Sequence, residues 1–134
     1  MKIFVIGAGV SSLAFCSFLD KNNITVLDSN KDSGRKLLAT GNGRCNFTNL
    51  NLSYDNYYSN EKNFVNYSLD NFSNKDLIEY FEYLGIDWVN LPSGRCYPKT
   101  MSSKTVKDSL MMKASENAKF IFEQKVVDID FKKK

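Results

Sequence analysis

The stretch "KIFVIGAGVSSLAF" (residues 2–15) decides the expected fold, because an apolar run in it ends at a glycine-rich turn. Residues 2–7 predict a short buried strand of a parallel sheet. The period then changes, and one helix face is formed by Val10, Leu13, Ala14, Ser17 and Phe18. "NNITVLD" (residues 22–28) predicts a second strand. Together these segments indicate a compact βαβ unit with a right-handed crossover.

The turn departs at one position from the dinucleotide-binding fingerprint G-x-G-x-x-G. Gly7 and Gly9 occupy the first two glycine positions, and Ser12 occupies the third. The first glycine permits the tight turn, the second lets the backbone approach a pyrophosphate, and the third allows close packing of helix and strand. A serine in the third position loosens that packing without blocking the phosphate site. Free amides and the positive dipole of the helix N-terminus still face the ligand.

An acidic residue at the end of the second strand completes the fingerprint by binding ribose hydroxyls. Asp28 has this position. We therefore expect the backbone amides after Gly7 to face a diphosphate and the carboxylate of Asp28 to lie beside the sugar. The alternative is a plain glycine turn with a solvated carboxylate, and the motif by itself does not separate FAD from NAD.

Composition excludes several other classes of function. The 134 residues suffice for one small domain, and 43% hydrophobic with 25% charged residues are typical of a soluble globular protein. The net charge of +3, with three lysines at the end, favours neither a nucleic-acid nor a membrane partner. Without histidine, and with three cysteines far apart, we expect no metal site and no Ser-His or Cys-His pair. The first apolar run is too short for a signal peptide, so we expect a cytoplasmic protein.

The rest of the chain predicts further α/β structure within a single domain over residues 1–134. We expect a loop over residues 33–49, a helical segment over 61–85, a hairpin or turn over 86–99 and a helix over 102–118. Two strands are expected at the end, over residues 120–122 and 126–131, the second because of its strict apolar alternation.

A second motif, "GRKLLATGNGRCNFTN" (residues 34–49), follows the βαβ unit. Its glycines permit positive φ angles, and its asparagines offer amide hydrogen bonds. Arg35, Lys36 and Arg44 bring three cations close to the expected pyrophosphate. Taken singly, this motif is most typical of an Asn/Gly-rich surface loop with charges for solubility.

Taken together, these motifs resemble the N-terminal part of the bacterial HI0933-like flavoproteins, also described as aminoacetone-oxidase-family FAD-binding enzymes. Their hallmarks G-[RK]-K-hydrophobic and T/S-G-x-G-R-C-N-hydrophobic-T-N appear here as "GRKLL" and "TGNGRCNFTN", and a third element appears as "SGRCYPKTMSSKTVKDSL" (residues 93–110). The resemblance implies an FAD-dependent oxidoreductase of the two-dinucleotide-fold type. Its fold would be an FAD/NAD(P)-binding, Rossmann-like, doubly wound parallel sheet, here incomplete, and NAD(P)H could donate electrons in the full-length family.

The resemblance also implies the cofactor-binding residues. Residues 7–12 would hold the FAD pyrophosphate, and Asp28 with the adjoining Ser29 the adenosine ribose. Val126 would contact the adenine through its backbone. Arg35 and Lys36 would lie along the ribose and phosphates, while Gly43, Cys45 and Asn46 would line the flavin side. The full set is Gly7, Ala8, Gly9, Val10, Ser11, Ser12, Asp28, Ser29, Arg35, Lys36, Gly43, Arg44, Cys45, Asn46 and Val126. No catalytic residue is assigned, because in flavin chemistry the cofactor carries the electrons.

Several roles stay open. Cys45 is either a redox thiol or a packed neutral thiol, with the latter favoured because no second cysteine is near. Arg44 binds an anionic substrate or the cofactor, or pairs with a carboxylate. Arg95 and Tyr97 belong either to a substrate mouth or to a stabilised turn.

The resemblance implies, further, that a substrate domain and a C-terminal flavin-binding segment are missing from this sequence. We therefore expect a truncated FAD-binding portion that completes catalysis only with the remainder, which could be a separate chain. The alternatives are a degenerate or binding-only fragment and an NAD(P)-binding module. A nucleic-acid role for the aromatic residues 54–72 is the weakest alternative, because they lack a positive groove.

Overall fold

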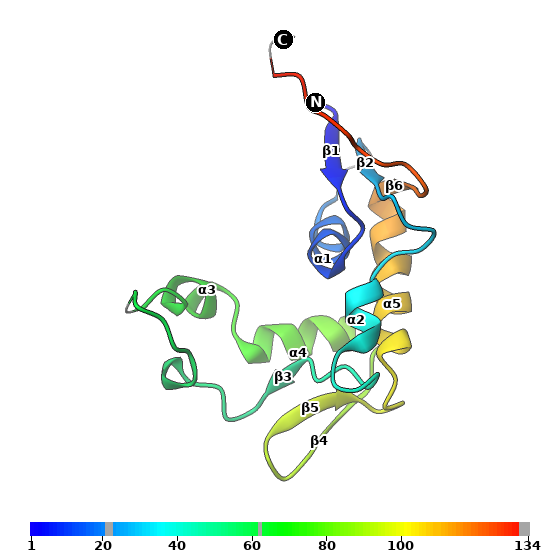
Figure 1. The fold of residues 1–134 in the computed structure, drawn as a ribbon. Helices are drawn as coiled ribbons and strands as arrows, with labels where there is room; N and C mark the ends of the chain where they lie inside the picture. The colour runs from blue at the N-terminus through cyan, green and yellow to red at the C-terminus, as the bar shows by residue number, and fades with distance from the viewer. Residues whose placement is uncertain (21–22, 62, 132–134) are drawn as a thin grey trace. The chain divides into compact units, whose positions relative to one another are not determined.

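The computed structural model describes residues 1–20, 23–61 and 63–131, and the chain expected as one domain folds as two compact units (Figure 1). Unit 1 is formed by Met1–Ala39 together with Lys107–Lys134, and unit 2 by Thr40–Val106. Residues 40–106 thus form a second core, and the residues on either side of them in the sequence form the first.

Unit 1 is built on a parallel three-stranded sheet with the strand order β1-β2-β6 (Figure 1). In its register, Ile3 is opposite Ile24, and Ile24 is opposite Ala118. This sheet confirms the predicted α/β, Rossmann-like class. The elements of unit 1 are β1 (Ile3–Ile6), α1 (Val10–Phe18), β2 (Ile24–Leu27), α2 (Arg35–Ala39), the part of α5 (Ser103–Asn117) from residue 107 onward, and β6 (Ala118–Ile121).

Helices α1 and α5 cover one face of this sheet. The strands follow one another in a single direction, and right-handed crossovers then place both helices on the same side. The two helices are tied together where the Asn117 side chain donates a hydrogen bond to the carbonyl of Cys16 at 3.1 Å. Ile24 and Val26 are buried beneath them, whereas the alternate residues of β1, Phe4 and Ile6, are 63% and 55% exposed. The core of unit 1 therefore lies between one sheet face and these two helices.

Unit 2 contains a small antiparallel sheet with the strand order β3-β5-β4. Ser73 caps helix α4 in a capping box with Asp76, and the ring of Phe47 packs on that of Phe81 with 4.7 Å between the centroids. The elements of unit 2 are β3 (Thr48–Asn49), η1 (Tyr54–Asn56), α3 (Asn66–Asn71), α4 (Asn74–Tyr83), β4 (Trp88–Asn90), β5 (Arg95–Pro98) and the first turn of α5.

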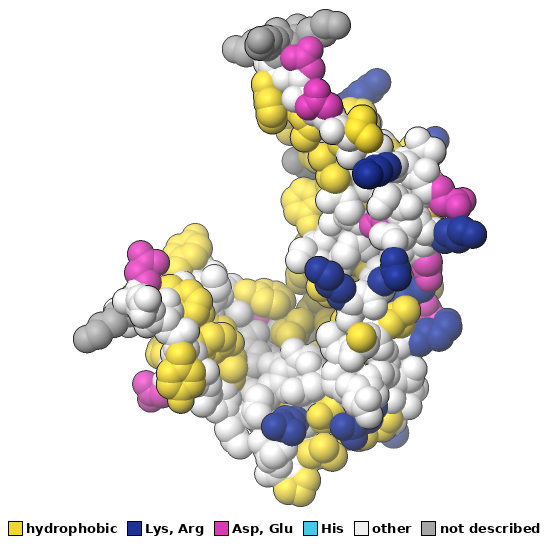
Figure 2. All heavy atoms as spheres, viewed as in Figure 1, with side chains coloured by type: hydrophobic (Ala, Val, Ile, Leu, Met, Phe, Trp, Pro, Cys, Tyr) yellow, Lys and Arg dark blue, Asp and Glu magenta, His cyan; other side chains and the backbone are white. Residues whose placement is uncertain are grey.

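Exposed aromatic side chains gather over η1 and α3, as the hydrophobic surface in Figure 2 shows. The exposed members are Tyr54, Tyr57, Tyr58, Phe64, Tyr67 and Phe72. None of the helices within the described ranges combines the length and the apolar character that crossing a membrane requires.

The structure corrects the predictions for two segments. The expected strand over residues 126–131 is not formed: although the sequence alternates, Val127 and Phe131 are both 85% exposed, and the polar residues between them are exposed as well. Alternation alone is insufficient, because a strand needs a neighbour for its backbone groups and a core for its apolar face. The segment predicted as a loop over residues 33–49 contains the helix α2 and the two-residue strand β3.

Candidate dinucleotide-binding site

The glycine turn leaves β1 and opens the N-terminus of α1. Gly7 has a φ of +91°, and its amide donates a hydrogen bond to the carbonyl of Leu27 at 2.7 Å. Gly9 is the N-cap of α1 and provides no side-chain cap; a Cβ added to Gly9 would meet no atom within 4 Å. The first amides of a helix have no acceptor within the helix. Together with the helix dipole, they form a setting that binds anions.

The carboxylate of Asp28 lies beside this turn. Its Oδ2 accepts a hydrogen bond from the amide of Ala8 at 2.6 Å, and its Oδ1 accepts from the backbone and side-chain nitrogens of Asn30 at 2.7 and 2.8 Å. Burial acts to raise the pKa of Asp28, but these hydrogen bonds and the charge of Arg35 lower it on balance. The group is therefore ionised at neutral pH and held in one orientation.

The hydrogen bond from Ala8 corrects one detail of the sequence prediction. The amides after Gly7 were expected to face a diphosphate, yet the amide of Ala8 is engaged by Asp28. A diphosphate at this helix end would therefore meet the amides from Gly9 onward. Because a carboxylate oxygen carries two lone pairs, Oδ2 of Asp28 keeps room for one further donor, such as a ribose hydroxyl.

A pocket of about 740 Å³ lies between the glycine turn and the start of α2. It contains both the acid of the fingerprint and two of the predicted cations. A side-chain nitrogen of Arg35 donates to Oδ1 of Asn30, and Nδ2 of Asn30 donates to Oδ1 of Asp28, so cation and carboxylate are linked through the amide group. The pocket is lined by Ala8, Gly9, Val10, Ser11, Asp28, Asn30, Asp32, Gly34, Arg35, Lys36 and Ala39.

A second pocket of about 380 Å³ lies at the carboxyl ends of β1 and β2. The segment after β6 reaches it because the amide of Gln124 donates to the carbonyl of Asp28 at 2.8 Å. The predicted residues that line it are Gly7, Asp28, Ser29 and Val126. Unit 1 thus brings all its predicted site residues to these two pockets except Ser12, which is half-buried in the first turn of α1.

The remaining predicted residues, 43–46, belong to unit 2. The Cys45 thiol is buried, which raises its pKa, so it is neutral at physiological pH. The side-chain amide of Asn46 lies against the carbonyls of Cys96 and Thr48, and with its nitrogen assigned to that side it donates to them at 3.2 and 3.0 Å. The carbonyl of Gly43 accepts from the amide of Ser103 at 2.8 Å. These contacts hold the G-N-G-R-C-N loop within its own unit.

Arg44 makes local contacts of a different kind. Its guanidinium lies 5.1 Å from the centroid of the Tyr97 ring, and its Nε donates to the carbonyl of Gly41 at 3.1 Å. Tyr97 is buried in β5, whereas the side chain of its neighbour Arg95 is exposed. A cation above an aromatic face is a stabilising arrangement.

The family assignment agrees with this geometry. The profile of the family described as HI0933-like protein Rossmann domain matches residues 1–134. The chain belongs to the HI0933-like family. The resemblance drawn from the sequence motifs is thereby confirmed, and the chain is a Rossmann-type dinucleotide-binding domain of a flavoprotein family.

The HI0933-like domain is similar to curated proteins with more than one activity. It is 36% identical over 95 residues to the ribosomal RNA dihydrouridine synthase of Haemophilus influenzae, and 35% identical over 96 residues to that of Escherichia coli; each match covers 69% of this chain and 24% of the relative. It is 29% identical over 115 residues to the 3-dehydro-bile acid delta(4,6)-reductase of Clostridium scindens, covering 83% of this chain and 28% of the relative. The chain spans about a quarter of the length of these relatives.

A solved structure supports the fold of the HI0933-like domain. The crystal structure of Thermovibrio ammonificans THI4 matches with a TM-score of 0.50 at 8% identity, covering 90% of this chain and 38% of that chain. At this identity the likeness concerns the fold alone.

Sequence reasoning missed two residues that line the pocket of about 740 Å³ in the HI0933-like domain, and the partner of one of them. Asn30 donates to the carboxylate of Asp28 and accepts from the guanidinium of Arg35, and the spacing Asp28-x-Asn30 is a recognisable Asx-turn signal. Asp32 lines the pocket and pairs with Lys107, which is 75 positions away in the sequence. No local pattern could have predicted that pair.

Proposed function

We propose that this chain binds FAD through unit 1 and serves as the FAD-binding portion of a flavin-dependent oxidoreductase. One observation carries the proposal. The ionised carboxylate of Asp28 and the uncapped N-terminus of α1 open into the same pocket. These are the two groups that a dinucleotide needs for its ribose and its diphosphate.

The residues present suit such a ligand. Gly9 leaves open space where a side chain would stand in the way of a diphosphate. Arg35 and Lys36 line the same pocket and supply positive charge. We assign the diphosphate to the amides of residues 9–12 and these two cations, and the adenosine ribose to Asp28 and Ser29.

Other assignments follow the family resemblance. We assign the adenine to the pocket that Val126 lines, and the flavin side to Gly43, Arg44, Cys45 and Asn46 of unit 2. When bound, FAD supplies the electron-transfer chemistry, while this chain binds and orients the cofactor. The relatives are named for dihydrouridine synthesis in ribosomal RNA and for reduction of a 3-dehydro bile acid. Because these substrates differ, we propose a cofactor and a reaction class without a substrate.

NAD and NADP are the competing ligands, since the fingerprint is shared. A 2′-phosphate would lie against the carboxylate of Asp28, which disfavours NADP. Direct titration of the purified chain with FAD, NAD and NADP by calorimetry, with a visible spectrum for bound flavin, tests the proposal. We expect saturable binding of FAD in preference to both nicotinamide dinucleotides.

A matched pair of variants locates the site. Asp28→Asn removes the charge beside the ribose, whereas Asp20→Asn removes the charge of an exposed acid that lines neither pocket. The first should weaken FAD binding and the second should not. Tighter binding of NAD than of FAD would instead favour an NAD-binding module, and a chain that binds none of the three ligands would be a degenerate fragment.

A further inference from the structure

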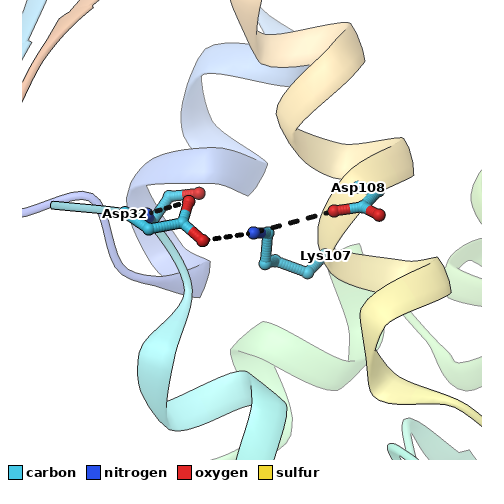
Figure 3. A network of polar contacts seen from close by, with 4 residues as sticks. Asp32, Lys107 and Asp108 are labelled. Atoms are coloured by element: carbon cyan, nitrogen blue, oxygen red, sulfur yellow. Dashed lines mark hydrogen bonds and ion pairs between the residues drawn. The ribbon is translucent and has the colours of Figure 1, made fainter.

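A buried lysine, Lys107, contacts two residues that line the pocket of about 740 Å³, Asp32 and Gly34. Nζ of Lys107, on α5, is 2.7 Å from Oδ2 of Asp32 and 3.6 Å from Oδ1 of Asp108 (Figure 3). Lys107 is only 8% exposed. Oδ1 of Asp32 accepts a second hydrogen bond, from the amide of Ser33 at 2.7 Å. The carboxylate of Asp32 is thus held on one side by the loop and on the other by a cation from a distant helix.

Asp32 is an unexpected residue in a pocket for a diphosphate. It lines the pocket together with Asp28, and these two carboxylates match the charges of the cations Arg35 and Lys36. An unpaired carboxylate at this position would repel a diphosphate, and water screens part of that repulsion because the side chain of Asp32 is 59% exposed. The hydrogen bond from Lys107 lowers the pKa of Asp32 and raises that of Lys107, so both groups carry their charges. Paired with Lys107, Asp32 offsets the cations of the pocket less than an unpaired carboxylate would.

The stem of Lys107 also packs against the backbone of the same loop. Gly34 has a φ of +65°, and a Cβ added there would lie 2.8 Å from Cγ of Lys107. The amide of Gly34 donates to the carbonyl of Ala8 at 2.8 Å, which joins the loop to the glycine turn. The side chain of Lys107 therefore packs directly on the loop that lines the pocket, and this packing leaves no room for a side chain at position 34.

We propose that Lys107 is a positioning residue of the cofactor pocket, which keeps Asp32 paired and so weakens the repulsion that this carboxylate would exert on a diphosphate. This inference rests on the proposed function, because it concerns the affinity of the same site. It assigns Lys107 an electrostatic role in addition to its packing.

The test is a double-mutant cycle with Lys107→Met, Asp32→Asn and both changes together. Methionine keeps much of the stem and removes the charge, and Lys119→Met is the matched control because this exposed lysine lines neither pocket. The readouts are the FAD dissociation constant by calorimetry at low ionic strength, and the thermal midpoint. We expect Lys107→Met to weaken FAD binding about tenfold, and to do so less as salt is added.

The variants of Asp32 separate an electrostatic from a merely structural role. Asp32→Asn should bind FAD at least as tightly as the wild type, and the double variant should recover to within about twofold of it. If the ion pair only holds the loop in place, Asp32→Asn will weaken FAD binding as Lys107→Met does, and the double variant will not recover affinity. That result overturns the inference. The affinity of Asp32→Asn distinguishes an electrostatic role from a structural one even if Lys107→Met fails to fold. A wild-type chain that does not bind FAD would overturn the proposed function and this inference with it, whereas a weakened Asp32→Asn variant of a binding wild type overturns this inference alone.

Discussion

The backbone amide of Ala8 donates a hydrogen bond to Oδ2 of Asp28 at 2.6 Å, which fastens the acid at the end of β2 to the glycine turn at the end of β1. Neighbouring parallel strands end at the same edge of a sheet, so the turn and the acid meet there. The bond gives Asp28 two functions. It ties the acid to the turn, and it fixes the position of a carboxylate that lines the pocket we assign to the dinucleotide.

Asp28→Asn should therefore lower stability as well as affinity. The carboxylate accepts three hydrogen bonds, and Asn would turn an NH2 group toward some of the same donors. We expect a loss of about 1–3 kcal/mol in the free energy of unfolding, as for hydrogen bonds to a charged group. Urea denaturation measures it, with Asp20→Asn as the control. Equal stability of the two variants would show that the bonds of Asp28 contribute nothing to folding.

The two glycines of the turn should respond differently to alanine. Gly7 has a φ of +91°, so Gly7→Ala should cost about 1–2 kcal/mol of folding free energy through backbone strain. Gly9 has a φ of −77°, and its Cβ would enter open space, so Gly9→Ala should leave the thermal midpoint nearly unchanged. The added methyl group would nevertheless occupy the approach to the helix amides. We expect Gly9→Ala to weaken FAD binding without destabilising the fold, and unchanged affinity would argue against a diphosphate at this position.

The free energy of unfolding should decrease at acid pH because two aspartates, Asp28 and Asp32, become protonated. The folded-state pKa values of Asp28 and Asp32 lie below the ordinary value, so each group binds its proton less readily in the folded chain. Their contribution is present above the unfolded pKa of about 4 and is lost as the pH falls through the lower folded values. Thermal midpoints measured from pH 7 downward should therefore decrease below about pH 5, and Asp28→Asn should flatten that decrease. A variant with the same acid profile as the wild type would contradict this linkage.

The cysteines should be unreactive while the chain is folded. Cys16, Cys45 and Cys96 are all buried and free, and burial raises the pKa of each thiol. Since the thiolate is the reactive form, alkylation at neutral pH should be slow until denaturant is added. Rapid modification of Cys45 in the native chain, detected by mass spectrometry, would revive the redox-thiol interpretation.

The parts of the fold that the sequence predicted depend on short-range patterns. The apolar run of residues 2–7, the change to a helical period after Gly9 and the position of Asp28 predicted the βαβ unit because each signal lies within a few residues of the element that it specifies. The resemblance of residues 34–49 to a known family placed the chain in that family. These predictions about the fold class are confirmed.

The rest depends on contacts between distant residues. The pairing of β6 with β2, and of Lys107 with Asp32, joins positions that share no local pattern. The two-residue strand β3 exists because β5 pairs with it. Conversely, residues 126–131 have the pattern of a strand without a partner in the described chain, so that prediction was wrong. In the site, Asn30 could have been found from its Asx-turn spacing, whereas the bond between Ala8 and Asp28 depends on how two strand ends meet.

The most direct test is amide chemical-shift mapping of the 15N-labelled chain during titration with FAD. The proposed site predicts that the amides of residues 9–12 and those around Asp28 shift together and saturably, with the amide of Ala8 still bonded to the acid. Shifts confined to other surfaces, such as the exposed aromatic residues over η1 and α3, or no shifts at saturating FAD, would contradict a diphosphate at the start of α1.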